Sequence, residues 1–327
     1  MNIGLREKVY QMFILGTDGG GYKSALAQGL GGVIFFTKDI LSDEQFKQTV
    51  CDIKNMAKIQ PFLSIDQEGG RVERTENIHG GKKYLSAKYA YERGLEYLEQ
   101  QTQEIAQELL SYGLNLNFAP CIDVNTNPSN PIIGERAFSS SVEDVILGEK
   151  VVSNVYKRNG IIPCVKHFPG HGDANADSHL TLPLMDMKLE ELEQTHIKPF
   201  KFAIENGAEM VMVAHLHCTC FEKATIPTSL SKNAISYLRD VLGFKGVVIS
   251  DDMVMKGVAK FGALDACIMA IKAGMDMFIY RDSFEQTLDL IENIYKLALE
   301  DIDLRLSIEK SYERIVKLKK KYLDIGE

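Results

Sequence analysis

Acidic and basic side chains gather between residues 163 and 179, where they could carry acid–base chemistry. An apolar run, IIPCVKH, delivers Lys166 and His167 at its end, and a Pro- and Gly-rich segment follows. That composition excludes a regular helix or strand, so we expect a loop. At its far end Asp177 and His179 stand two residues apart. A carboxylate beside an imidazole stabilises its cation, so this pair could give and take a proton near neutral pH. A solvated loop with a structural Asp–His contact is the alternative.

A second candidate is Asp251, which ends the apolar run VVIS at residues 247–250. A carboxylate that leaves a buried strand suits an ionised nucleophile or a general base. The structural alternative is a helix cap, which Asp252 or Ser250 could provide instead. Adjacent side chains point in different directions, so one aspartate can be chemical while the other supports it.

Polar or ionisable side chains follow several other apolar runs. In a barrel of parallel strands the active site forms at the carboxyl ends of the strands. One or two such groups could be helix caps or loop ion pairs. A purely structural protein does not need an ionisable side chain at the end of strand after strand. The side chains at these ends are Asp66, Asp123, Lys166, His167, His215, Asp251 and Arg281.

Eight short apolar runs alternate with amphipathic segments along the chain. The runs cover residues 12–17, 32–36, 62–66, 114–120, 161–167, 210–215, 246–251 and 275–280. Near-continuous apolar runs are typical of parallel strands covered on both faces. Helices are predicted over 42–58, 94–112, 142–158, 189–206, 231–242, 263–273, 283–299 and 304–322, after a short N-terminal helix. The pattern predicts an α/β fold, a single TIM-like (β/α)8 barrel, with a doubly wound sheet as the alternative.

Bulk properties narrow the class of protein. The chain has 327 residues and a net charge of -8, which argues against nucleic acid or an anionic membrane as a partner. We see no linker or repeat and predict one domain over residues 1–327. The charged N-terminal residues, and six cysteines lying mostly in apolar patterns, predict a cytoplasmic protein with reduced thiols. The basic run at 317–321 is expected to be a solvated helix end without function.

Five segments resemble the motifs of family 3 glycoside hydrolases, in particular the NagZ-type β-N-acetylglucosaminidase branch. The signature is KHFPGHG at 166–172 with DSH at 177–179. The others are SIDQEGGRV at 64–72 with Arg74, NFAPCID at 117–123, GERAF at 134–138 and SDDM at 250–253. They run in family order and, with the flanking strands, the resemblance spans about residues 11–279.

The resemblance implies a TIM-like barrel and a retaining, two-step mechanism. Asp251 matches the family's nucleophile, which forms a covalent glycosyl-enzyme. His179 matches the acid/base of this branch, with Asp177 as its orienting partner. A histidine in this role departs from the usual pair of carboxylates in retaining glycosidases.

The resemblance also implies a set of sugar-binding residues. Asp66, Arg74, Arg136, Lys166 and His167 match positions that hold the terminal sugar, and for the two arginines an ion pair with a nearby acid is the alternative. His215 and Met253 could line the pocket. The segment HLHCTC at 215–220 has the residue types of a zinc site but not the spacing, so we predict neither a metal nor another cofactor.

The predicted function is that of an exo-β-N-acetylglucosaminidase. It would act as a monomer and release terminal GlcNAc from cytoplasmic muropeptides during cell-wall recycling. A phosphorylase using the same site is an alternative, because a neutral His179 would not repel phosphate. A β-glucosidase is another, although its acid/base usually comes from a second domain that this chain is too short to supply. A non-catalytic sugar- or metal-binding barrel is the alternative outside the enzymes.

Overall fold

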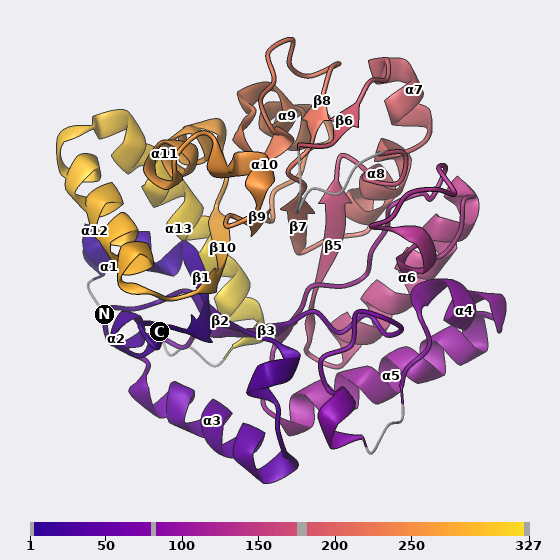
Figure 1. The fold of residues 1–327 in the computed structure, drawn as a ribbon, viewed down its shortest axis with the longest axis horizontal. Coiled ribbons are helices and arrows are strands. Elements are labelled where there is room, and N and C mark those ends of the chain that lie inside the picture. The colour runs from indigo at the N-terminus through magenta and orange to yellow at the C-terminus, as the bar shows by residue number, and fades with distance from the viewer. Residues whose placement is uncertain (1–2, 80–82, 175–181, 324–327) are drawn as a thin grey trace.

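The computed structural model describes residues 3–79, 83–174 and 182–323 and contains a closed barrel of eight parallel strands (Figure 1). In chain order the barrel strands are β1 (Phe13–Asp18), β2 (Gly32–Phe35), β3 (Phe62–Ile65), β4 (Leu116–Asn117), β5 (Ile162–Phe168), β7 (Met210–Val213), β9 (Val247–Asp252) and β10 (Met277–Asp282). Around the barrel the order is β1-β10-β9-β7-β5-β4-β3-β2, so the last strand pairs with the first. The predicted TIM-like (β/α)8 barrel is confirmed, and each strand falls within or beside a predicted apolar run.

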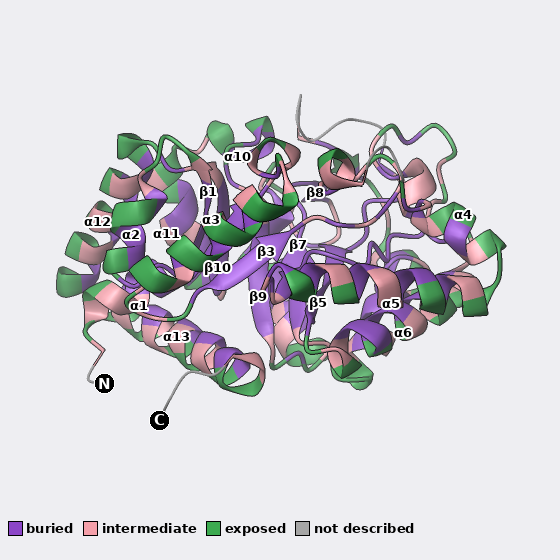
Figure 2. Ribbon diagram, turned by 90° about the horizontal axis from the view of Figure 1, so that it is seen from below, coloured by how far each residue is buried: buried purple, intermediate pink, exposed green. Residues whose placement is uncertain are grey.

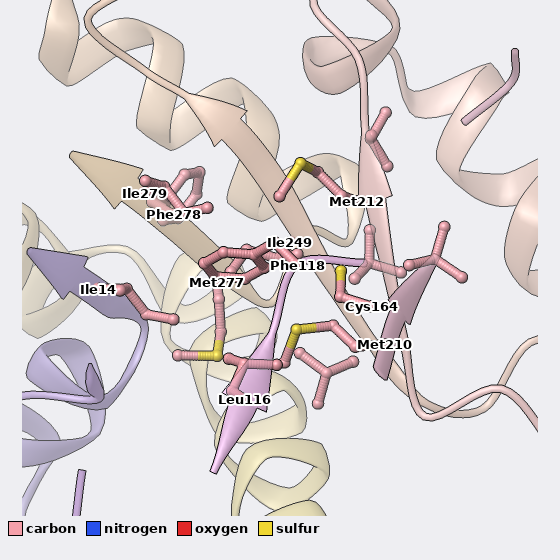
Figure 3. Packing of buried hydrophobic residues seen from close by; sticks show 14 of the residues in the cluster. Ile14, Leu116, Phe118, Cys164, Met210, Met212, Ile249, Met277, Phe278 and Ile279 are labelled. Atoms are coloured by element: carbon pink, nitrogen blue, oxygen red, sulfur yellow. The ribbon is translucent and has the colours of Figure 1, made fainter. Parts of the chain in front are cut away.

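Apolar side chains from opposite sides of the barrel fill its interior (Figure 3). Leu116, Cys164, Met210, Ile249 and Met277 come from five different strands, and all are buried. Burying one such large aliphatic side chain stabilises the fold by about 1.5–3 kcal/mol. The interior is therefore a packed core, and this leaves the ends of the strands as the place for a site.

Helices cover the outside of the barrel with their apolar faces turned inward and their polar faces outward (Figure 2). They are α1 (Leu5–Gln11), α2 (Tyr22–Ala27), α3 (Asp43–Met56), α4 (Ala87–Glu92), α5 (Leu95–Ser111), α6 (Val142–Arg158), α7 (Leu189–Gln194), α8 (Ile197–Glu205), α9 (Lys232–Ser236), α10 (Lys256–Ala259), α11 (Ala263–Ala273), α12 (Glu285–Glu300) and α13 (Ile302–Tyr322). The predicted start of α3 is confirmed, because Ser42 Oγ accepts a hydrogen bond from the Gln45 backbone N–H at 3.2 Å. No helix in the described ranges has the length and apolar character needed to cross a bilayer.

Two predicted helices are interrupted. The helix expected over 189–206 divides into α7 and α8 at Thr195. Pro199 explains the break, because its ring would clash with the Thr195 carbonyl of a continuous helix, whereas the first turn of α8 accommodates it. The helix expected over 231–242 ends at Ser236 and continues as a π-helical segment, η5 (Tyr237–Val241). The sequence analysis also missed α2, α4, α10 and a small sheet of β6 (Leu184–Met185) and β8 (His217–Cys218).

The basic run at the end of α13 is not uniformly solvated, in contrast to the expectation. Lys319 is fully buried, and its Nζ donates to Gln11 Oε1 at 2.9 Å and to the Gln60 carbonyl at 2.8 Å. The same Nζ lies 4.9 Å from the centre of the Phe62 ring. Gln11 precedes β1 and Gln60 precedes β3, so this cation lies beneath the amino ends of the strands.

Candidate active site

A cavity of about 310 Å³ opens at the carboxyl ends of the barrel strands. Its wall contains six of the predicted site residues: Asp66, Arg74, Arg136, Lys166, His167 and Asp251. The other lining residues are Ile34, Phe36, Val72, Ile132, His171, Met212, Asp252, Met255, Ile279 and Arg281. Several strand ends and the loops that follow strands contribute these side chains, so residues far apart in the sequence meet around one space.

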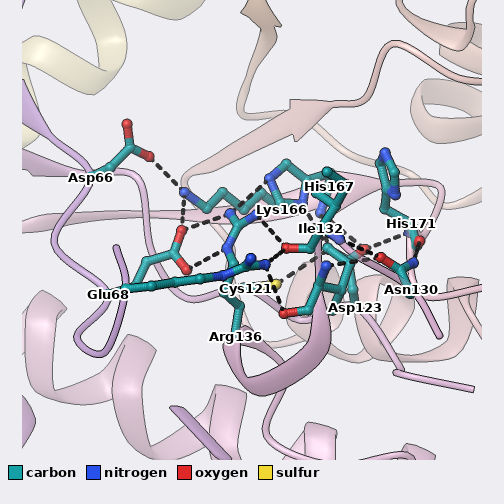
Figure 4. A network of polar contacts seen from close by, with 12 residues as sticks. Asp66, Glu68, Cys121, Asp123, Asn130, Ile132, Arg136, Lys166, His167 and His171 are labelled. Carbon is teal, nitrogen blue, oxygen red and sulfur yellow. Dashed lines mark hydrogen bonds and ion pairs between the residues drawn. The ribbon is translucent and has the colours of Figure 1, made fainter. Parts of the chain in front are cut away.

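Four charged side chains, Asp66, Glu68, Arg136 and Lys166, form a largely buried network on one side of the cavity (Figure 4). Lys166 Nζ lies 2.7 Å from Asp66 Oδ1 and 2.6 Å from Glu68 Oε1. Arg136 makes a bidentate contact with the same Glu68, with Nε and Nη2 at 2.9 and 2.8 Å from its two oxygens. Arg136 thus makes the ion pair that was the structural alternative, and it still faces the cavity. Glu68 holds the two cations side by side.

Glu68, Arg136 and Lys166 stabilise one another's charged forms. Burial opposes ionisation of Glu68, but the charges of Arg136 and Lys166 and their hydrogen bonds outweigh it, so the pKa of Glu68 is far below its usual range. Burial likewise opposes the charge on Lys166, but Asp66 and Glu68 outweigh it and raise the pKa of Lys166 above its ordinary value. A permanently charged set of groups is suited to orient the hydroxyls of a polar ligand.

A buried aspartate fixes the orientation of His167. Asp123 Oδ2 lies 2.7 Å from His167 Nδ1, and Asp123 Oδ1 accepts the His171 backbone N–H at 2.6 Å. Burial opposes ionisation of Asp123, but His167 and His171 outweigh it and hold the pKa of this carboxyl well below its usual range. On its other edge, His167 Nε2 lies 3.3 Å from Arg136 Nη2. The ring is therefore held from two sides, with one part of it lining the cavity.

Asp251 and Asp252 at the end of β9 have different surroundings. Asp251 Oδ1 accepts the Asp252 backbone N–H at 2.7 Å. Burial opposes its ionisation, but His167, His215, that N–H group and Lys166 outweigh it, so the pKa of Asp251 is lowered. Asp252 instead contacts Arg281 and accepts the Val254 backbone N–H at 3.1 Å. An ionised carboxylate at the cavity wall can act as a nucleophile, and its neighbour supports the turn.

Arg74 lies on the apolar side of the cavity. Its guanidinium carbon is 5.9 Å from the centre of the Phe36 ring, a cation–π contact. Within the described ranges its buried Nε has no hydrogen-bond partner, and no acidic side chain forms an ion pair with it. A ligand in the cavity could satisfy this donor.

Two glycines shape the loop that follows β5. Gly170 has a φ of +122°, and an added Cβ would lie 2.4 Å from His196 Cβ. A Cβ on Gly172 would lie 1.8 Å from the Val124 carbonyl oxygen. Between them, the buried His171 ring lines the cavity, and neither ring nitrogen has a partner among the residues described. The loop is thus packed against the Asp123 region with no room for a side chain at either glycine.

The remaining predicted site residues are not in this wall. Asp177 and His179 lie outside the described residues. His215 is buried behind Asp252, with its Nδ1 2.7 Å from Ser229 Oγ and its Nε2 3.1 Å from the Asp252 carbonyl oxygen. Met253 lines a separate hollow beside α11 and α12. The structure therefore does not bring His215 and Met253 to the cavity in which they were expected.

Glu68 and His171 are site residues that the sequence analysis did not assign. Glu68 lies in the motif at 64–72, two residues after Asp66, but the sequence does not reveal that it pairs with Lys166 of β5 and with Arg136 of a short 3-10 helix, Gly134–Arg136. Asp123 was noted at a strand end without a role.

One buried cluster has the residue types of a metal site: Cys121, Asp123 and His167, with ligand atoms within 4.8 Å of one another. The Cys121 Sγ to Asp123 Oδ2 distance of 3.2 Å and the His167–Asp123 distance of 2.7 Å are those of hydrogen bonds. The expected absence of a metal stays a prediction.

Comparisons with known proteins agree with the motifs. Residues 4–318 match the family model described as the glycosyl hydrolase family 3 N terminal domain. A β-hexosaminidase from Psychromonas ingrahamii is 34% identical over 282 residues, which cover 83% of this chain and 82% of the relative. β-Hexosaminidase A from Pseudoalteromonas piscicida is 32% identical over 270 residues, which cover 76% of this chain and 45% of that protein.

The fold has similar solved structures as well. A glycoside hydrolase family 3 β-N-acetylglucosaminidase from Paenibacillus sp. str. FPU-7 superposes with a TM-score of 0.91 at 30% identity, covering 99% of this chain and 64% of that one. This chain thus spans less than two thirds of the length of some relatives. The resemblance noted in the sequence is confirmed, and the chain belongs to glycosyl hydrolase family 3.

Proposed function

We propose that this protein is a retaining exo-β-N-acetylglucosaminidase in which Asp251 is the nucleophile. The observation that carries the proposal is an ionised Asp251 in the wall of a cavity that also contains Lys166, Arg136 and His167. Relatives named β-hexosaminidase and β-N-acetylglucosaminidase support the choice of sugar. At about 310 Å³, the cavity is at the small end of the range for ligand pockets, about 300–1,000 Å³, which suits one terminal sugar unit.

In the first step the Asp251 carboxylate attacks the anomeric carbon and the bond to the leaving group breaks. The product is a glycosyl ester of Asp251. Asp66, Lys166, Arg136, Arg74 and His167 hold the hydroxyl and acetamido groups of the sugar during this step. Glu68 holds Lys166 and Arg136, and Asp123 holds His167, before substrate binds, and such preorganisation lowers the barrier.

We propose that His179, oriented by Asp177, protonates the leaving oxygen and then activates the water that hydrolyses the ester. The support is the DSH motif together with the course of the chain on either side of it. Before the motif, His171 lines the cavity, and after it β6 pairs with β8. A histidine can serve as both acid and base near neutral pH.

The natural substrate and setting are part of the same proposal. The resemblance to the NagZ-type branch supports muropeptide fragments as substrates and cell-wall recycling as the process. All six cysteines are free thiols, which supports a reducing compartment such as the cytoplasm. We further propose one domain over residues 1–327 and a monomer, which sedimentation analysis of the purified protein would test.

Phosphorolysis is the second candidate, and the cations around the cavity favour it. Arg74, Arg136, Lys166 and Arg281 all line the space, and Arg281 is 43% exposed. Phosphate could then replace water in the second step. Product analysis with and without phosphate separates the two reactions, because only the phosphorylase forms a sugar 1-phosphate.

Replacing Asp251 tests the nucleophile. We expect Asp251→Ala to lose roughly 10⁴-fold or more of the turnover of an aryl β-N-acetylglucosaminide, the scale observed when a nucleophile is removed. Asp240→Ala, on the exposed end of η5, is the control and should retain wild-type turnover. A mechanism-based fluorosugar should label Asp251 in the wild type. A label on another residue, or normal turnover by Asp251→Ala, would refute the assignment.

A further inference from the structure

The last residue of β8, Cys218, has its thiol in contact with that of Cys220 in the turn that follows. Cys218 Sγ and Cys220 Sγ lie 3.3 Å apart. Cys218 is buried, whereas Cys220 is partly exposed. The backbone already forms a tight turn, because the Phe221 and Glu222 N–H groups both donate to the Cys218 carbonyl oxygen at 3.1 Å. Neither sulfur takes part in the glycosidase mechanism proposed above.

The geometry is close to that of a disulfide. A disulfide bond is about 2.05 Å long, so the two sulfurs need to approach by a little over an ångström. The contact shows that both side chains already point to the same side of the turn. The contact is also chemically useful, because a hydrogen bond from the Cys218 thiol stabilises a thiolate on Cys220 and lowers the pKa of Cys220. The more accessible sulfur is thus the more nucleophilic one.

Metal binding is a weaker explanation for the pair. Among the residues described, one group of three side chains could hold a metal ion, and it consists of Cys121, Asp123 and His167. It includes neither Cys218 nor Cys220. The nearest histidine in sequence, His217, directs its Nε2 to the Glu222 carbonyl oxygen at 2.9 Å. Two thiolates without a third ligand do not complete the four-coordinate shell of a structural zinc site.

We propose that Cys218 and Cys220 are a redox modification site, which low-molecular-weight disulfides such as oxidised glutathione convert to an intramolecular disulfide. The Cys220 thiolate attacks one sulfur of the small disulfide, forms a mixed disulfide and releases one thiolate. Cys218 then loses its proton to solvent and attacks the Cys220 sulfur, which releases the second small thiolate. The protein loses two electrons and two protons, and the small disulfide is reduced to two thiols.

The turn is hydrogen-bonded to residues 183–186, which follow the predicted acid/base pair in the sequence. Thr219, between the two cysteines, donates its N–H to the Met185 carbonyl oxygen at 3.1 Å and its hydroxyl to Asp186 Oδ1 at 2.8 Å. His217 donates its N–H to the Pro183 carbonyl oxygen at 2.8 Å. Closing the disulfide ring constrains Thr219 and therefore this pairing of β8 with β6. We expect oxidation to reduce turnover, an effect that rests on the proposed function because β6 closely follows Asp177 and His179 in the chain.

Peptide mass analysis of the whole protein tests the modification. The exposed Cys51 is first replaced by Ser, so that it cannot form a mixed disulfide, and the folded protein is treated with oxidised glutathione and then alkylated. We expect the tryptic peptide 202–223, which holds both cysteines, to lose two hydrogens and both alkylation sites, and a dithiol reductant to restore them. Cys218→Ser should instead stop at a glutathione adduct on Cys220. A wild-type peptide that is alkylated twice after oxidation, or that carries glutathione without closing, would overturn the proposal.

Activity measurements on the same samples test the link to the site. The oxidised protein should lose several-fold in turnover of a substrate with a poor leaving group, and the double variant Cys218→Ser/Cys220→Ser should be insensitive to glutathione. A disulfide that forms without changing turnover would contradict the link. A reduced protein that hydrolyses no β-N-acetylglucosaminide would instead contradict the proposed function, and the peptide assay would still decide the fate of the thiols.

Discussion

At the scale of single residues, the site depends on one buried acid between two cations. Glu68 has 4% of its side chain exposed and contacts both Lys166 and Arg136. Without its charge the two cations would repel each other in the cavity wall. Its role is to position these cations, because its oxygens are directed to them and it is not in the cavity wall.

We expect Glu68→Gln to lower kcat/KM by at least tenfold, mainly through a higher KM, because the binding groups are displaced while Asp251 is unchanged. Breaking one partner of a buried ion pair should also cost about 3–5 kcal/mol in the free energy of unfolding. Steady-state kinetics and urea unfolding measure the two effects.

The matched control is Glu143→Gln, which removes an exposed ion pair with Lys198 and should change stability by less than about 1 kcal/mol. Equal loss of kcat and kcat/KM with an unchanged KM in Glu68→Gln would contradict a positioning role.

The sequence predicted the side chains of the cavity wall better than the side chains that hold them in place. Asp251, Lys166 and His167 were predicted as site residues because each ends an apolar run, and the barrel brings these three ends to one cavity. Glu68 was missed because its partners, Lys166 and Arg136, are distant in the sequence, and only the folded chain brings them within reach. His215 also ends an apolar run, yet the side chain turns behind Asp252, a direction that the pattern of apolar residues does not encode.

At the scale of elements, the loop after β5 can pack in its observed position only because Gly170 and Gly172 have no side chains. Gly172 lies against the Val124 carbonyl, and the adjacent His171 N–H is bonded to Asp123. A larger residue here separates two loops that both border the site. The sequence predicted a loop from its Pro and Gly content but not the contact that makes glycine necessary at this position.

We expect Gly172→Ala to lower the free energy of unfolding by roughly 1–3 kcal/mol, the usual effect of overpacking. It should also reduce turnover, because displacement of the loop moves His171 and weakens its bond to Asp123. Thermal unfolding and aryl glycoside hydrolysis measure these effects.

Gly4→Ala is the control, since the added carbon meets only the end of the Glu7 side chain. If Gly172→Ala is as stable and as active as Gly4→Ala, the contact between Gly172 and Val124 is unimportant.

Helix breaks belong to the same scale. Pro199 was visible in the sequence, but the amphipathic pattern across residues 189–206 is continuous and concealed the break before α8. The π-helical segment that continues α9 contains no proline that could have predicted it. A change from α-helical to π-helical hydrogen bonding does not alter the sequence pattern of apolar residues.

At the scale of the whole molecule, a buried cation beneath the barrel makes stability depend on pH. Burial lowers the pKa of Lys319 from its ordinary 10.5 to about 7. Between these two pH values the unfolded chain binds more protons at this position than the folded chain does. The contribution of Lys319 therefore makes the protein more stable as pH rises from about 7 towards 10.5, and below 7 this contribution no longer changes.

We expect the stability of the wild type relative to Lys319→Met to rise between pH 7 and 9, by up to about 1 kcal/mol per pH unit. Urea unfolding at several pH values gives this difference. Lys320→Met, on the exposed neighbouring position, should show no such trend. If the difference in the free energy of unfolding between the wild type and Lys319→Met does not change between pH 7 and 9, Lys319 keeps its charge in the folded protein.

The pairing of β10 with β1 has a consequence for how the protein is made. As the chain leaves the ribosome, the first barrel strand can find one neighbour early, in β2, but its other edge stays open until residues near 280 have been synthesised. Contacts between such distant parts of a chain form slowly, and unpaired strand edges invite association with other chains. Newly made molecules should therefore be vulnerable to aggregation for most of translation, and protection by chaperones should matter most just before the last strand emerges.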